Sequence, residues 1–403
     1  MKKIVTLVAL SLMAMGAWAQ NATSSPTSRF GYGELNNNLP GAYRAMGGVG
    51  VGMRSNKVIN SAQPASYTSC DSMTFMFDVA GSLLYTNYSE SDKQNNKVNG
   101  NLEYITMQFP IWRKYIAMSL GVTPYSAVGY DFALTDSINS DYYYSQTYRG
   151  VGGFTQVYGG LSVNICDWVA LGVNAYYMFG TIEQSRSLNF TDATMDSVRL
   201  VETLRANSLR LRYGAQFFHT FGKHTISLGA VFENKQPFSR LNYEQIEQTT
   251  ADTVTMIDNG FEMPMMYGVG LSYGYDNRLV IGADYMCHDW ANAKYFGQTQ
   301  SLNRRHRWAV GAEYRNDPTS RKFVDQVYWR LGVNYTTAYT HHYSAAELGI
   351  GLGVGFPLRT AGTIINATVE YGKRGTQTVL SENYLRLVIN ASISEHWFFK
   401  RKL

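Results

Sequence analysis

The chain has 403 residues, of which 45% are hydrophobic and 14% aromatic, and its formal net charge is +5. Removal of Lys2 and Lys3 with a cleaved leader lowers this charge to +3, which is too small to indicate a nucleic-acid partner. The 30 Tyr, 7 Trp and 37 Gly favour another class, because Tyr and Trp suit membrane–water interfaces and Gly suits crowded barrel interiors.

The first 19 residues have the three parts of an export signal. Lys2 and Lys3 precede a mostly apolar run over residues 4–15, and Ala17-Trp18-Ala19 forms a small-x-small cleavage site before Gln20. The apolar run is too short to span a membrane. We therefore expect residues 1–19 to be a cleaved signal peptide; the alternative is a buried N-terminal helix.

Residues 20–72 do not alternate in hydropathy, and we expect them to form a hatch or plug inside a barrel. They are rich in Gly and contain two groups of interest: Gly47, Gly48 and Gly50, then Asn60, Gln63, Pro64 and Ala65. The glycine run is not a nucleotide-binding loop, because no strand precedes it and no βαβ unit surrounds it. The alternative is a disordered periplasmic tail.

Residues 73–395 contain fourteen segments in which apolar and polar residues alternate, as in strands with one apolar face. No stretch after the leader has about 18 consecutive apolar residues, so a membrane-spanning chain must be a closed barrel. We predict an all-β, 14-stranded antiparallel transmembrane β-barrel in the bacterial outer membrane, followed by a periplasmic tail at 396–403; the alternative is a soluble sandwich. The predicted strands are 73–89, 101–111, 114–125, 153–165, 168–185, 206–220, 224–236, 264–275, 278–290, 305–315, 327–340, 345–357, 362–373 and 383–395.

The predicted connections alternate between short and long, as in barrels with short periplasmic turns and long outer loops. The long ones are 90–100, 126–152, 186–205, 237–263, 291–304 and 374–382. Two connections break the alternation: 316–326 is a long periplasmic turn, and 341–344 is a short outer loop.

The alternation also assigns residues to the two faces of the barrel wall. On the last strand, Leu385, Leu387 and Ile389 face lipid, whereas Arg386 faces inward. The same reasoning gives a lumen of mixed charge, which favours internal pairing over a wide pore, and its predicted lining residues include Asp284, Glu313, Glu370, Arg210, Arg212, Arg330 and Arg386. Four more inward residues, Gly349, Gly351, Gly353 and Gly355, leave one wall without side chains, where a plug or ligand can approach; alternatively, they relieve crowding.

Two motifs resemble a known family. Residues 44–51 (RAMGGVGV) and 60–67 (NSAQPASY) are similar to the N-terminal hatch of FadL-type hydrophobic-compound transporters, in the branch common in Bacteroidetes, and the ending at 397–402 is similar to that branch too. The resemblance implies a fourteen-stranded barrel with a hatch. The family's Asn-Pro-Ala signature is offset here into Asn60 and Gln63-Pro64-Ala65, so the role of that turn is not carried over.

The resemblance also implies a mechanism in which a hydrophobic molecule enters from outside, the hatch moves, and the molecule leaves sideways through a gap at the third strand. Gly121 and Pro124 lie on that strand, and Pro124 has no N–H for the ladder. The alternative is that Pro124 simply ends the strand.

Three functions compete. The first is passive uptake of fatty-acid-like molecules, with outer-membrane lipid as a further partner. The second is an accessory barrel, PorV-like or BAM-associated, that binds proteins of a secretion or assembly machine through its outer loops. The third, an enzyme, is not expected, since no Ser or carboxylate motif accompanies the His residues; no catalytic residue, cofactor or metal site is predicted. A transporter needs a movable hatch and an apolar pocket, whereas an accessory barrel needs a fixed plug and a polar lumen.

Overall fold

The computed structural model describes residues 23–37, 39–90, 93–137, 143–190, 197–248, 253–257, 260–341, 346–358, 362–376 and 380–396. The predicted signal peptide and the ending at 397–402 lie outside the described residues. Among the described helices, none is both long and apolar enough to cross a membrane.

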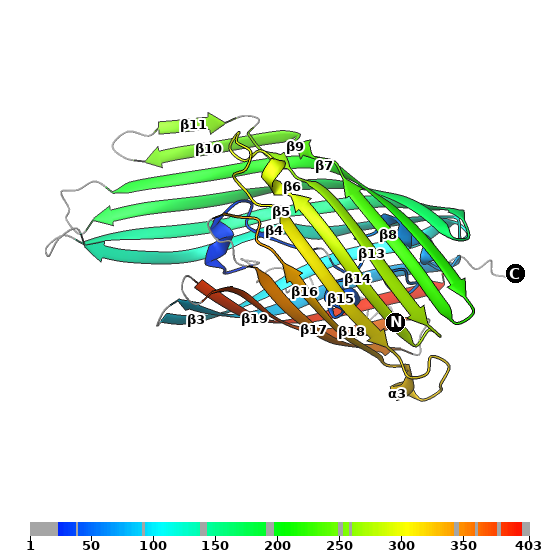
Figure 1. Cartoon of the computed structure of the whole chain (residues 1–403). Helices are drawn as coiled ribbons and strands as arrows, with labels where there is room; N and C mark the ends of the chain where they lie inside the picture. The colour runs from blue at the N-terminus through cyan, green and yellow to red at the C-terminus, as the bar shows by residue number, and fades with distance from the viewer. Residues whose placement is uncertain are drawn as a thin grey trace, which may run out of the picture.

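Fourteen antiparallel strands form a closed barrel in the described part of the chain, and the predicted fold class is confirmed (Figure 1). The last strand pairs with the first over its full length, from Ser381 with Ser89 to His396 with Thr74. The barrel strands are β2 (Thr74–Glu90), β3 (Lys93–Trp112), β4 (Ile116–Ser137), β5 (Tyr143–Cys166), β6 (Val169–Phe190), β7 (Val198–Phe221), β8 (His224–Glu233), β13 (Met265–Tyr275), β14 (Leu279–Asp289), β15 (Arg305–Tyr314), β16 (Tyr328–Thr336), β17 (Glu347–Pro357), β18 (Ile364–Thr376) and β19 (Leu380–His396).

The barrel is taller on one side than on the other. Strands β4 to β7 have 22 to 24 residues each, whereas β15 and β16 have 10 and 9. In Figure 1 these long strands extend well beyond the others at the outer end. Strand β10 (Arg240–Gln248) pairs with β7 and with β11 (Thr253–Ile257), which widens this projecting sheet.

The projecting sheet corrects three predicted loops. Most of 90–100, 126–152 and 186–205 is strand, because β3 to β7 continue past the predicted ends. In these outer parts the apolar alternation is lost, since neither face needs to contact lipid. The predicted loop 237–263 is corrected as well, because it contains β10 and β11 together with the short strands β9 (Gln236–Pro237) and β12 (Glu262–Met263). The loop 291–304 follows the start of η3 (Trp290–Asn292). The long turn at 316–326 holds α3 (Phe323–Gln326).

A belt of apolar side chains surrounds the barrel wall. Leu385, Leu387 and Ile389 on β19 are exposed, as are Trp308 and Val310 on β15. Alternate residues on the same strands, such as Asn390 and Arg307, are buried inside. An exposed apolar belt around a closed sheet fits lipid rather than water, and the chain is an outer-membrane β-barrel.

Residues 23–37 and 39–73, called here the N-terminal segment, lie largely buried inside the barrel. They contain η1 (Pro26–Arg29), β1 (Glu34–Leu35), α2 (Gly41–Arg44) and η2 (Pro64–Ser69), with Pro at the start of both 3₁₀ helices. Strand β1 pairs with β4 from within. The three cysteines, Cys70, Cys166 and Cys287, are free.

An aromatic cluster, called here the cap, closes the barrel above the N-terminal segment. The ring of Tyr32 lies at its centre, 5.3 Å from Trp290 and 5.8 Å from Phe238 between centroids. Tyr339 contacts Trp290 and accepts a hydrogen bond from the Tyr32 amide at 3.1 Å. Residues of three outer connections thus meet at Tyr32 of the N-terminal segment.

Candidate functional site

The N-terminal segment packs against a row of glycines on the inner wall. Gly282, Gly311, Gly332 and Gly351 are cross-strand partners on β14 to β17. A Cβ on Gly311 or Gly332 would overlap the backbone of Met46, and one on Gly351 would lie 2.9 Å from the carbonyl oxygens of residues 44 and 45. Only glycine allows two backbones to approach this closely.

The four glycines predicted on β17 all lie on the inner face. Gly351 and Gly353 meet the N-terminal segment at Ala45, whereas Gly349 and Gly355 lie against the inward amides of Asn334 and Asn366. The contact of the wall with the segment therefore involves the middle pair, and it continues sideways along the cross-strand row.

Two barrel side chains hold the glycine run of the N-terminal segment. The Asp284 carboxylate accepts hydrogen bonds from three successive backbone amides, those of Gly50, Val51 and Gly52. The Arg307 guanidinium donates to the carbonyls of Gly47 (2.6 Å) and Gly48 (3.0 Å). Gly47 and Gly48 have φ of +69° and +77°, a conformation that favours glycine. The run binds its own barrel rather than a phosphate.

The offset turn motif makes a second anchor. The Asn60 amide donates to the carbonyls of Gly50 (2.7 Å) and Met53 (3.2 Å) within the segment. The Gln63 side chain accepts from the Ala65 amide, which caps η2 at Pro64, and donates to carbonyls of β7 and β8. The side chain of Gln63 therefore links the N-terminal segment to the barrel wall.

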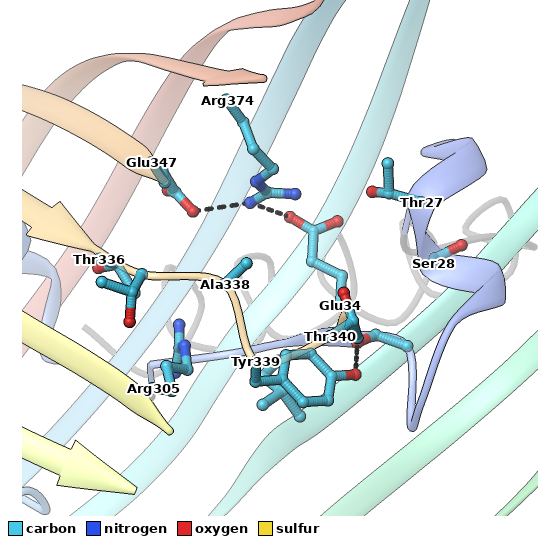
Figure 2. Close-up of a pocket in the computed structure, with 13 residues that line it drawn as sticks. Thr27, Ser28, Glu34, Arg305, Thr336, Ala338, Tyr339, Thr340, Glu347 and Arg374 are labelled. Carbon is cyan, nitrogen blue, oxygen red and sulfur yellow. Dashed lines mark hydrogen bonds and ion pairs between the residues drawn. The ribbon is translucent and has the colours of Figure 1, made fainter. Parts of the chain in front are cut away.

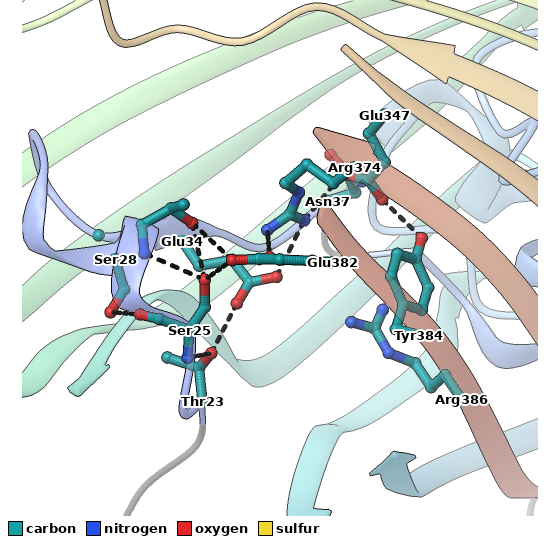
Figure 3. Close-up of polar contacts among 12 residues, drawn as sticks. Thr23, Ser25, Ser28, Glu34, Asn37, Glu347, Arg374, Glu382, Tyr384 and Arg386 are labelled. Carbon is teal, nitrogen blue, oxygen red and sulfur yellow. Dashed lines mark hydrogen bonds and ion pairs between the residues drawn. The ribbon is translucent and has the colours of Figure 1, made fainter. Parts of the chain in front are cut away.

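A charge network joins the N-terminal segment to the outer ends of β17, β18 and β19. Arg374 lies 2.8 Å from Glu347 and 3.1 Å from Glu34 (Figure 2). It also lies 3.5 Å from Glu382. Glu382 in turn accepts a hydrogen bond from Ser25, as Figure 3 shows beside Tyr384, which donates to Glu347.

The other predicted lumen charges are also paired. Arg44 of α2 bridges Glu103 (2.8 Å) and Glu370 (3.4 Å), and Arg386 shares Glu370 at 3.5 Å. Arg330 pairs with Glu313 across neighbouring strands at 2.6 Å. Arg210 and Arg212, which were also predicted to line the lumen, both form ion pairs with Glu233. The described lumen is largely neutralised by its own side chains.

The ladder between β3 and β4 stops partway up the barrel. Pairing runs from the periplasmic turn to Ile105 with Val122 and not beyond, although both strands continue outward. Gly121 is in the paired part, and Pro124 is at a register shift in the β4–β5 ladder. Strand β4 does not end at Pro124. Its free edge is taken by β1 of the N-terminal segment, with Leu35 opposite Ser126.

A cavity lies behind this unpaired seam. Its lining includes neutral residues of β1, β3 and β4. It also includes three arginines and three glutamates: Arg44, Arg374, Arg386, Glu34, Glu103 and Glu347. The adjoining cavity in Figure 2 shares Glu34, Glu347 and Arg374. These surroundings suit a polar or charged group and do not resemble the mostly apolar pockets that take hydrophobic ligands.

The residues that sequence reasoning missed are those whose partners are far apart in the chain. Arg374, Glu347 and Glu382 were predicted to lie in or beside outer connections, and Glu34 and Tyr32 precede the recognisable motif. In the sequence, Arg374, Glu347 and Glu382 are marked only by their charge. Tyr32 is marked only by the Phe-Gly-Tyr-Gly run at 30–33.

Comparison with solved structures shows the fold of FadL-type channels. The chain is similar to a Pseudomonas aeruginosa FadL homologue (13% identity, TM-score 0.61, covering 90% of this chain and 99% of that one). It is similar to the Ralstonia pickettii toluene transporter TbuX (13%, 0.61, 87% and 96%) and to the CymD monoaromatic hydrocarbon channel (10%, 0.59, 90% and 98%). A search of curated proteins found no match. One family model, BamG, matches residues 1–403, and the chain belongs to the BamG family.

Proposed function

We propose that this protein is a non-conducting accessory barrel of an outer-membrane assembly machine, with protein partners rather than a transported substrate. The observation that carries the proposal is the way the N-terminal segment fills the lumen. Backbone packs on wall glycines, Asp284 and Arg307 bind the glycine run, and Arg374 joins Glu34 to the wall. Opening a path requires breaking all of these buried contacts together, which favours a fixed plug.

Membership in the BamG family supports the same role, since a BAM-associated barrel is one of the alternatives raised by the sequence. The projecting sheet supplies a surface for partners outside the membrane. This sheet consists of the outer parts of β4 to β7, and β10 pairs with β7 at its edge. The proposal includes no catalytic step.

A second candidate is passive transport of hydrophobic, fatty-acid-like molecules, with the N-terminal segment as a movable hatch and a lateral exit. The fold shared with the hydrocarbon channels and the unpaired β3–β4 seam favour it. The charges behind the seam count against it, because an apolar molecule passing Glu103 and Arg386 gains no compensating contact.

The two candidates differ in whether the N-terminal segment must move, and a disulfide can lock it. Leu35 and Ser126 are opposite each other in the β1–β4 ladder, next to the hydrogen bond from the Asn36 amide to the Tyr125 carbonyl. Such a pair has a Cα separation compatible with a disulfide. The test is the double variant Leu35→Cys/Ser126→Cys in a background in which the three native cysteines are replaced by Ser.

We expect the oxidised, locked barrel to support normal abundance of other outer-membrane barrels and to retain its protein partners after mild-detergent purification. Matched measurements use the reduced form, the cysteine-free parent and a deletion strain. Loss of hydrophobic-compound uptake on oxidation, restored by reductant and without change in barrel assembly, would establish transport instead.

A further inference from the structure

A third cavity, below the cap and beside the N-terminal segment, combines several cationic side chains with neutral polar and apolar ones. Four arginines face it: Arg210, Arg212, Arg305 and Arg307. His288 also lines the cavity, and Glu233 is the one carboxylate in its lining. Asn36, Asn37 and Gln156 add amide groups, and the apolar part of the lining consists of Leu39, Ala62, Tyr125, Pro264 and Met286. With four arginines and one carboxylate, the lining carries a net positive charge.

The carboxylates around this cavity already have hydrogen-bond or ion-pair partners. Glu233 binds both Arg210 (2.8 Å) and Arg212, and it is 3% exposed. Nearby Asp284 accepts three backbone amides, as described above, and Glu347 is bound by Arg374 at 2.8 Å. Arg305 and Arg307 have no ion pair among the described residues; their bonds go to the Asn37 side chain and to the carbonyls of Gly47 and Gly48.

Three side-chain nitrogens at the cavity are buried without a hydrogen-bond partner in the described structure. The Nε atoms of Arg210 and Arg307 and the Nδ1 atom of His288 are in this state. Arg305 and Arg307 are only 8% and 3% exposed, respectively. A buried guanidinium that no carboxylate contacts and a buried polar nitrogen without a hydrogen-bond partner both destabilise the folded barrel. A bound anion would compensate for both features.

We propose that this cavity binds a tetrahedral oxyanion of the phosphate or sulfate type, held by Arg305 and Arg307 of β15 beside Asn37 of the N-terminal segment. Guanidinium groups present forked donors that match the oxygens of such an anion. The ligand could come from free phosphate or from the headgroup of a bound lipid, and the chemistry of recognition is the same for both. This site is independent of whether the barrel has an accessory or a transport role.

The test compares the purified, full-length barrel with Arg305→Gln, using inorganic phosphate as the probe. Isothermal titration calorimetry measures binding, and the temperature at which the barrel unfolds on SDS gels measures stability. Arg304→Gln is the matched control, because the adjacent Arg304 is exposed and pairs with Asp289 outside the cavity. Arg305→Lys tests whether the charge alone suffices.

Phosphate should bind the wild-type and Arg304→Gln barrels and raise their unfolding temperature. Arg305→Gln should weaken binding at least tenfold and lower the unfolding temperature, with partial recovery in Arg305→Lys. An empty cavity predicts the opposite sign, because removal of an uncompensated buried charge is then stabilising. A more stable Arg305→Gln barrel together with no phosphate binding by wild type would overturn the proposal.

The source of the anion is resolved by denaturing the purified wild-type barrel and measuring phosphorus in the aqueous and organic phases. Phosphorus in the aqueous phase at one equivalent indicates a free ion, whereas phosphorus in the organic phase that disappears in Arg305→Gln indicates a lipid headgroup. A wild-type barrel that contains neither and binds no phosphate contradicts the site.

Discussion

Asp284 shows how a single side chain can hold a chain segment in the lumen. Its carboxylate accepts the amides of residues 50, 51 and 52, all of which are buried. A carboxylate that meets several backbone amides compensates for its own burial and satisfies donors that no ladder reaches.

Replacement Asp284→Ala should therefore leave three buried amides unpaired and destabilise the barrel by about 3 kcal/mol. The measurement is the unfolding temperature on SDS gels, with protease cleavage of residues 23–73 as a second readout. Asp131→Ala, at an exposed position in the outer part of β4, is the control and should behave as wild type. Equal stability of the two variants would show that Asp284 does not hold the segment.

Position 332 requires glycine because of the close contact there and not because of its backbone conformation, since the φ of Gly332 is not positive. A Cβ there overlaps Met46 and Gly47, whereas a Cβ on Gly274, also on an inner strand face, first meets Thr225 at 3.6 Å. Gly332→Ala should cost about 1–3 kcal/mol by overpacking and displace the N-terminal segment. Gly274→Ala should change stability by less than about 0.5 kcal/mol; thermal unfolding of both variants decides the matter.

At the scale of elements, β1 and three barrel strands meet at Arg374. Arg374→Gln removes the cation shared by Glu34, Glu347 and Glu382 and leaves these carboxylates close together with little exposure. The expected loss is about 3–5 kcal/mol, because one partner of a buried network is gone. Lys373→Gln, on the outer face of the same strand, should have little effect. Native-state proteolysis near residues 23–37 would show whether β1 is released, and an unchanged cleavage pattern would contradict the prediction.

The same junction predicts a response to acid. Burial opposes ionisation of Glu34, but Arg374 and Arg386 outweigh it and hold its pKa below the ordinary 4.5. A depressed pKa contributes stability that is present above the ordinary value and is lost as the pH falls through the lowered pKa. Hydrogen exchange of residues 23–37, corrected for intrinsic rates, should accelerate below pH 4.5 in wild type. Glu34→Gln should lose most of this dependence while remaining folded.

Sequence reasoning succeeded for elements whose two faces have different surroundings. The lipid-facing stretch of β19 alternates because lipid is on one side and polar lumen on the other, and its bounds were predicted within a few residues. The outer halves of β4 and β5 have no such contrast, so the sequence predicts loops there instead of strands. The β1–β4 pairing was missed for a further reason: two residues carry no periodicity, and their partner is about 90 residues away.

At the scale of the whole molecule, the lumen is closed at two levels. The cap lies at the outer mouth, around Tyr32, and the glycine run of the N-terminal segment crosses the barrel at the level of Gly332. Both levels depend on the N-terminal segment, since Tyr32 belongs to it as well. The sequence predicted a segment of this kind and a lumen of mixed charge, but not the cap, because its aromatic residues come from three separate outer connections.

The purified barrel should therefore show no ion conductance in a planar lipid bilayer, whereas deletion of residues 23–73 should open a stable pore. The deletion removes Tyr32 from the cap and the backbone that lies on the wall glycines, so water and ions can fill the lumen. A heat-modifiable band on SDS gels establishes that the shortened barrel is folded, and Leu35→Cys/Ser126→Cys in its oxidised form is the control that must stay closed. Regular conductance steps from the intact barrel, abolished by that disulfide, would mean that the N-terminal segment moves as a gate and that the accessory role has to give way to transport.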